Sequence, residues 1–295
     1  MRGGRAFLTL TLYLLGLSII AVGIISLTTR SMGAGGTQST TTGISIFMTI
    51  AFFQLAVASF LTLAFTADAI TKEKEQQTYD LLITTKMSPF EIVWGKLLSS
   101  ISYMVLLILG SLPITSIVFV FGGVAVSDFI IAYVITLTTT VLFGAIGLFF
   151  SSILSKTQFS SVLAYASALF LCFGTMLFAL FVAALLLSNG PQNNDIAIPI
   201  LRAILIFNPF YALGSVFAGT VQGPFSVSML VGGAMQESPL IPDWLYTLVA
   251  YGLLTAFLLA MSTKRIKRVN GKSQNKRAGV LRRKKDASQD FAGIG

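Results

Sequence analysis

Six apolar segments without a single charged residue restrict this chain to one class of fold. Each is 19 to 29 residues long, and a helix of about 20 apolar residues crosses the core of a bilayer. In lipid every backbone polar group must be hydrogen-bonded internally, which favours helices over open strands. The sequence therefore predicts an all-α polytopic membrane protein with six transmembrane helices, at residues 6–27, 44–67, 97–121, 129–150, 159–187 and 244–262.

The composition is that of a membrane protein and limits which catalytic and metal-binding residues the chain can offer. Of the 295 residues, 55% are hydrophobic and 11% are charged, whereas a soluble domain has about 25% charged residues. The first segment is longer than the 7–15 apolar residues typical of a secretory signal, so we expect an uncleaved span. The chain has no His and only one Cys, Cys172. We therefore expect no catalytic residue, no metal site and no cofactor on this chain.

The basic residues predict how the spans are oriented. All but two of the 20 Lys and Arg residues lie at the N-terminus, between spans two and three, between spans four and five, or after span six. The positive-inside rule places these segments on the cytoplasmic side. We therefore expect a multi-pass protein of the cell membrane (plasma or inner) with both termini in the cytoplasm.

Residues 188–243 are apolar in part but do not have the pattern of a simple span. They hold six of the eight prolines, together with Arg202 and the Asn208-Pro209 step. A seventh span at residues 196–219 would also place the basic C-terminal segment outside. We expect short re-entrant helices in the outer leaflet before span six, because broken backbone is tolerated where protein buries it. A seventh span is the alternative.

The C-terminal segment, residues 266–295, is basic and shows no apolar periodicity. We expect it to be a disordered cytoplasmic tail. Asn270-Gly271-Lys272-Ser273 ends like a phosphate-binding loop, but Ile266 stands where the first Gly of that motif belongs. The tail is therefore no nucleotide site.

The segment between spans two and three carries the densest charge between two apolar runs. Ser88, Pro89 and Glu91 form the pattern of a helix start, with Ser88 as N-cap, Pro89 at the first helical position and Glu91 closing a capping box. This helix should continue into span three. Upstream of it, one face of a short helix would be apolar, with Tyr79, Leu82 and Ile83 at i, i+3 and i+4.

Residues 73–100, EKEQQTYDLLITTKMSPFEIVWGKLLSS, resemble the loop between spans two and three of type-2 ATP-binding-cassette (ABC) transporter permeases. That family has an E-K-E stretch, a T-x-D-L-L run and an S-x-x-E-I-x-x-G-K start to the next span. The six spans and the Asn-Pro-Phe step before span six are similar to the family as well. The resemblance covers about residues 6–265, and it implies that residues 1–265 form a permease domain.

The resemblance also implies partners and site residues. The chain would be the transmembrane subunit of an exporter, pairing with a second permease subunit as a homo- or heterodimer within membrane lipid, with no nucleic acid. A cytosolic coupling helix between spans two and three would contact a separate ABC ATPase, which would hold ATP and Mg²⁺. The residues implied in this contact are Glu73, Lys74, Glu75, Thr78, Asp80, Leu81 and Leu82.

Other functions remain open at this point. The sequence does not exclude a non-transporting accessory or assembly subunit with a permease-like fold. An ion-coupled secondary transporter usually keeps ionisable residues within its spans, and no span core here has one. An intramembrane enzyme is disfavoured because the usual nucleophile and metal motifs are missing from the sequence. The transported substrate is not indicated by any residue pattern.

Overall fold

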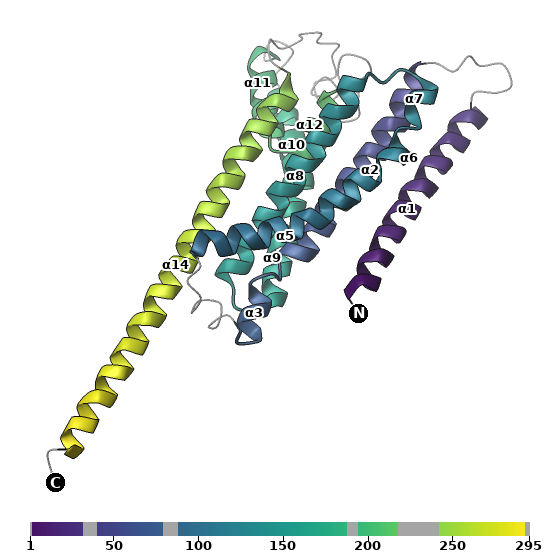
Figure 1. Cartoon of the computed structure of the whole chain (residues 1–295). Helices are drawn as coiled ribbons and strands as arrows, with labels where there is room; N and C mark the ends of the chain where they lie inside the picture. Colours follow the sequence, from purple (N-terminus) through teal and green to yellow (C-terminus); the bar gives the residue numbers. More distant parts are fainter. Residues whose placement is uncertain (1, 32–39, 79–87, 188–193, 218–241, 293–295) are drawn as a thin grey trace.

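The computed structural model describes residues 2–31, 40–78, 88–187, 194–217 and 242–292 of the chain (Figure 1). Every regular element within these residues is helical, as the sequence predicts. The elements are α1 (Arg2–Ser31), α2 (Thr40–Thr66), α3 (Thr71–Glu75), α5 (Pro89–Gly110), α6 (Leu112–Thr115), α7 (Val118–Phe121), α8 (Val126–Ile153), α9 (Thr157–Leu169), the π-helix η2 (Phe170–Gly174), α10 (Thr175–Leu187), α11 (Asn194–Leu205), α12 (Pro209–Ser215) and α14 (Asp243–Ala292).

Within the described residues, six helical stretches are long and apolar enough to cross a membrane, which confirms the six predicted spans. The second stretch includes both α2 and α3, but α2 ends at Thr66 and α3 carries four consecutive charged residues. Charged residues are costly in the bilayer core, so we place α3 beyond the membrane-crossing helix. The stretches are Phe7–Leu27, Gly43–Glu75, Pro89–Phe121, Val126–Ile153, Thr157–Leu186 and Asp243–Lys267.

Helix α8 is the centre of the bundle and packs against α2, α5, α9 and α14. It approaches α2 closely at Gly147, where an added Cβ would lie 2.1 Å from Thr66 Oγ1. The buried hydroxyls of Thr139 and Thr140 donate to carbonyls one turn earlier on α8 itself. Small residues let helix backbones approach closely in membranes. Gly147 therefore leaves room for the end of α2 beside α8.

The third span is interrupted near its far end. Helix α5 ends at Gly110, and Pro113 lies in the first turn of the short α6 that follows. Proline cannot donate a backbone hydrogen bond and clashes with the preceding turn. The span is therefore continued by α6 and α7, and α7 ends at Phe121, directly before Gly122, whose φ is 77°.

The region before span six contains two short helices rather than one continuous span. The axes of α11 and α12 differ in direction by 117°, which agrees with the predicted short helices. Asn208 caps α12, because its Oδ1 accepts hydrogen bonds from the backbone N–H groups of Phe210 and Tyr211. Its Nδ2 donates to the Cys172 carbonyl in η2 and to Thr175 Oγ1. A single buried amide thus fixes this bend against span five.

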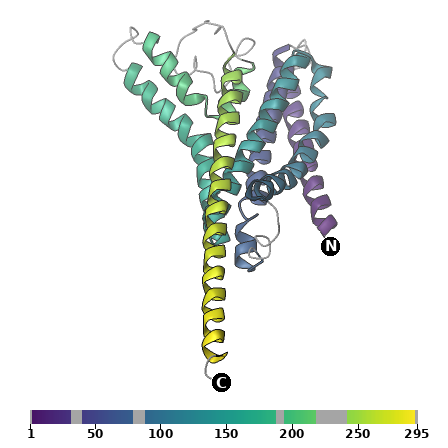
Figure 2. The ribbon, with the colours of Figure 1, turned by 60° about the vertical axis from the view of Figure 1, so that its left-hand side comes forward.

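Helices α10 and α11 form a separate unit at the end opposite α3. Figure 2 shows them diverging from the rest of the bundle. They share a small apolar core of their own, made by Ala179, Ala183, Leu201, Leu205 and Tyr211. The π-helix η2 lies where this unit leaves the bundle. π-Helical turns release backbone groups from the regular ladder, and here the Cys172 carbonyl is taken up by Asn208.

The C-terminal segment differs from expectation. We expected disorder from residue 266, but α14 continues as one helix to Ala292 and projects beyond the bundle (Figures 1 and 2). Ile266 is buried in the bundle, so packing extends past the expected boundary at residue 265. Residues 266–292 contain no proline and hold nine Lys and Arg residues, which have good helix propensity. A helix begun in span six can therefore continue, although Gly271 and Gly279 favour it less.

Candidate functional site

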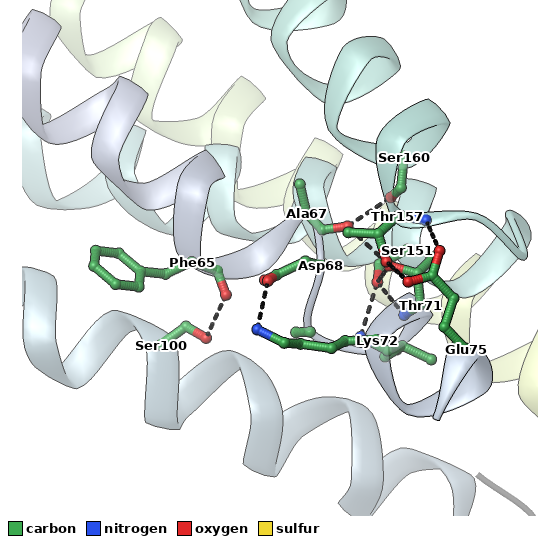
Figure 3. A network of polar contacts seen from close by, with 12 residues as sticks. Phe65, Ala67, Asp68, Thr71, Lys72, Glu75, Ser100, Ser151, Thr157 and Ser160 are labelled. Carbon is green, nitrogen blue, oxygen red and sulfur yellow. Dashed lines mark hydrogen bonds and ion pairs between the residues drawn. The ribbon is translucent and has the colours of Figure 1, made fainter. Parts of the chain in front are cut away.

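The charged helix α3 is held against the end of α8 from its first residue. Ser151, in the last turn of α8, accepts hydrogen bonds at its Oγ from the backbone N–H groups of Ile70 and Thr71, at 2.8 and 2.9 Å (Figure 3). The first N–H groups of a helix have no partner within it. The hydroxyl of Ser151 therefore caps α3 from a residue about 80 positions away in the chain.

Lys74 makes a second contact between α3 and α8, because its side chain caps the C-terminus of α8. Its Nζ donates to the carbonyl oxygens of Ser151, Ser152 and Leu154, at 3.1, 2.7 and 2.8 Å. The last carbonyls of a helix lack intrahelical partners and carry the negative end of its dipole. One ammonium group thus satisfies three of them.

Glu75 makes the matching contact to the start of α9. Its Oε1 accepts from the backbone N–H of Thr157, and its Oε2 accepts from the hydroxyl of Thr157, both at 2.8 Å (Figure 3). Thr157 is the first residue of α9, where the helix dipole is positive. A further bond from Ser160 Oγ to the Ala67 carbonyl, at 2.6 Å, ties α9 to the turn before α3.

Glu73 connects α3 to the third span. Its Oε1 lies 2.5 Å from Lys96 Nζ, and each side chain is about a quarter exposed. The same ammonium donates to the Ala69 carbonyl at 2.6 Å. Because this pair is partly shielded from water, it holds α5 more firmly than a fully exposed ion pair would.

The C-terminus of α3 is closed by a Schellman motif. The N–H of Gln77 donates to the Lys74 carbonyl and the N–H of Thr78 to the Glu73 carbonyl, at 3.3 and 3.1 Å. Gln77 has a φ of 56°, in the left-handed region that this motif requires and that glycine usually fills. The motif turns the chain away from α3 directly before residues 79–87.

The two capping side chains have shifted acidities, each with a clear cause. Hydrogen bonds from Thr157 lower the pKa of the Glu75 carboxyl, so the carboxylate form is favoured. Burial, together with the nearby Arg265 guanidinium, lowers the pKa of Lys74 to about 8. Keeping an ammonium at this position is therefore costly, and its three carbonyl partners offset that cost.

The residues expected in the coupling contact are divided between described and undescribed parts of the chain. Glu73, Lys74 and Glu75 lie in α3 and contact α5, α8 and α9, and Thr78 follows the end of α3. The other three, Asp80, Leu81 and Leu82, lie outside the described residues. Sequence reasoning missed Ser151, Thr157 and Ser160. The small polar residues of the connector between spans four and five indicate a turn, but no sequence pattern shows what that turn contacts.

The start of α5 carries the expected cap. Ser88 Oγ accepts from the N–H of Glu91 at 3.3 Å, and Glu91 Oε2 accepts from the N–H of Ser88 at 2.8 Å. Pro89 is the first residue of the helix. All three residues act locally, so they fix where α5 begins rather than how it meets α3.

Taken together, these contacts join α3 to four crossing helices. It follows α2 in the chain and bonds to the ends of α8 and α9 and to the side of α5. A displacement of α3 would therefore reach four spans at once. This geometry suits the transmission of movement, since the partners of Lys74 and one partner of Glu75 are backbone groups at helix ends, which shift only with the helices themselves.

The whole chain was compared with known proteins. A family model described as ABC-2 family transporter protein matches residues 15–262, from within the first span to within the sixth and including α3. No curated protein matches the chain. The family match confirms the resemblance drawn from residues 73–100. This chain is a multi-pass membrane protein that belongs to the ABC-2 transporter family, as the permease subunit of an ABC transporter.

Proposed function

We propose that a separate ABC ATPase drives this permease subunit by docking on residues 73–82. The position of α3 is the observation that carries the proposal, because this charged helix contacts the ends of several spans. The sequence has no phosphate-binding loop of the G-x-x-x-x-G-K-[ST] type. ATP and Mg²⁺ are therefore bound by the partner, and this chain contributes the membrane path.

The same proposal includes the sidedness of the subunit. The N-terminal end of α1, helix α3 and the far end of α14 all point toward one end of the bundle (Figures 1 and 2). This end also carries almost all of the Lys and Arg residues. The positive-inside rule supports a cytoplasmic location for it, where an ATPase has access to cellular ATP.

Export through a pair of permease subunits completes the proposed function. Membership of the ABC-2 family supports both points. The second subunit is either another copy of this chain or a related permease, and the path runs between the two within membrane lipid.

The docking proposal is tested by recovering the ATPase with the chain. The wild-type chain, purified in mild detergent from its native membranes, should carry an ABC ATPase whose ATP turnover rises in reconstituted vesicles when the permease is present. Leu81→Asp removes an apolar side chain from the proposed contact, so co-purification should fall by about tenfold or more, equal to roughly 1.4 kcal/mol of binding free energy.

The amount of Leu81→Asp protein in the membrane and its thermal midpoint serve as controls for folding. Wild-type chain that recovers no ABC ATPase would contradict the proposed function. A Leu81→Asp chain that binds ATPase as well as wild type would instead contradict the assignment of Leu81 to the contact.

A further inference from the structure

We propose that Lys74 and Glu75 form a latch that transmits the movement of α3 to spans four and five, rather than a surface that binds the ATPase. The inference rests on the proposed function and deepens it, because it separates docking from transmission within residues 73–82. Docking is then left to the other residues of the segment, and the two capping side chains act as positioning residues.

The first support is that both side chains already have partners within the chain. Lys74 has three hydrogen donors and uses them on three carbonyls of the α8 C-terminus. Glu75 uses both carboxylate oxygens on Thr157. An ATPase could bind the Lys74 ammonium only by displacing a carbonyl that fixes α3. Glu75 is exposed, but its carboxylate is already tied to the start of α9.

The second support is the match between charge and helix end. The C-terminus of α8 carries the negative end of a helix dipole and the N-terminus of α9 the positive end. Only three residues, Leu154 to Lys156, separate the two helices. Adjacent residues of α3 place a cation on the first helix end and an anion on the second. The pair thus holds both sides of one tight turn between spans.

The third support is the contrast with Lys72, which lies on the same helix. Its side chain is 63% exposed, and its ion pair is with Asp68, four residues earlier in the chain. That pair spans one turn of the same segment and reaches no other span. Lys72 also lies before the proposed docking segment, residues 73–82, and among the described residues its ion pair stays within its own turn, whereas Lys74 is engaged with α8.

Loss of the latch should separate two properties of the subunit, the binding of the ATPase and the coupling of its movement to the spans. Without the latch, the other residues of the segment 73–82 still present the docking surface, so the ATPase still binds. Movement of α3 then reaches α8 and α9 less effectively, because the hydrogen bonds of Lys74 and Glu75 are lost while the Ser151 and Ser160 hydroxyl contacts remain at and just before the start of α3. Binding should persist while coupling falls.

The test compares Lys74→Met and Glu75→Ala with the matched control Lys72→Met. Both latch variants should co-purify with the ATPase at the wild-type level. Stimulation of ATP turnover in vesicles should fall by about five- to tenfold, the lower range of coupling between protein sites. Lys74→Arg, which keeps a cation and its donors, should recover most of the stimulation. Lys72→Met should leave stimulation unchanged, because that side chain contacts no other span.

The outcomes distinguish the two proposals. If the wild-type chain recovers no ATPase, the proposed function fails. If the wild-type chain binds the ATPase but the latch variants stimulate it fully, the latch is wrong. Latch variants that fold but release the ATPase would show that these side chains dock the partner, which also overturns the latch.

A cysteine pair keeps the test decisive if the substitutions disturb folding. Glu75→Cys with Thr157→Cys, in a Cys172→Ser background, removes the Glu75 contact and places two thiols at its ends. A short bifunctional thiol reagent should restore the stimulation that the unlinked pair has lost, within one preparation of protein. Linked protein that binds ATPase yet shows no gain in stimulation would overturn the latch.

Discussion

At the scale of single residues, Gln77 has a backbone conformation that its side chain does not favour. Its φ of 56° places it in the left-handed region, which costs a residue with a Cβ roughly 1–2 kcal/mol relative to glycine. Gln76, the preceding residue, has a φ of −80° and carries no such strain. The two neighbouring glutamines therefore allow one substitution to be compared in two conformations.

We expect Gln77→Gly to raise the free energy of unfolding by about 1 kcal/mol, because glycine adopts the left-handed conformation freely. Gln76→Gly should lower it by about 0.5–1 kcal/mol, since it only adds flexibility to the unfolded chain. The thermal midpoint of the purified protein in detergent measures both. Equal shifts for the two variants would contradict the assigned conformation of Gln77.

The sequence located the charged residues of the site but not their partners. The run from Glu73 to Glu75 stands out because it is polar between two apolar segments, and its family pattern is local. Its contacts to Ser151 and Thr157 join positions about 80 residues apart. Serine and threonine are common in membrane helices and mostly bond their own backbone. Their role as caps for another helix depends on three-dimensional proximity, which no local pattern contains.

At the scale of elements, boundaries set by local chemistry were more predictable than those set by packing. The capping residues before α5 are within four positions of each other, so their pattern can be read directly. The break at the Asn208-Pro209 step was predicted, but the π-helix η2 was not, because it is stabilised by the Asn208–Cys172 bond, which joins distant parts of the chain. The helical extension of α14 was missed because basic composition was taken to indicate disorder, although Lys and Arg also favour helices.

The packing of α2 on α8 gives the next prediction. An Ala side chain at residue 147 would place Cβ 2.1 Å from Thr66 Oγ1 and 2.9 Å from Thr66 Cβ, so the two helices would have to separate. We expect Gly147→Ala to lower the free energy of unfolding by about 1–3 kcal/mol through overpacking. The thermal midpoint in detergent measures the change.

Gly252 provides the matched control for this substitution. It also lies within a membrane-crossing helix, α14, but an added Cβ there would meet no atom within 4 Å. Gly252→Ala should be neutral or stabilising by up to about 1 kcal/mol, because alanine has the higher helix propensity. If Gly147→Ala is tolerated as well as Gly252→Ala, the close approach of α2 and α8 is wrong.

At the scale of the whole molecule, sequence and structure agree on the number of spans, and the orientation can be tested on one helix. Ser127 lies in the first turn of α8 and Ser155 two residues after its last residue, and both are exposed. Single cysteines at these positions, in a Cys172→Ser background, report the two sides of the membrane. Because the basic residues gather at the Ser155 end, an impermeant thiol reagent should label Ser127→Cys in intact cells. Ser155→Cys should react only after the cells are opened. Labelling of Ser155→Cys from outside would show the opposite orientation, in which α3 faces away from the cytoplasm and cannot contact the ATPase.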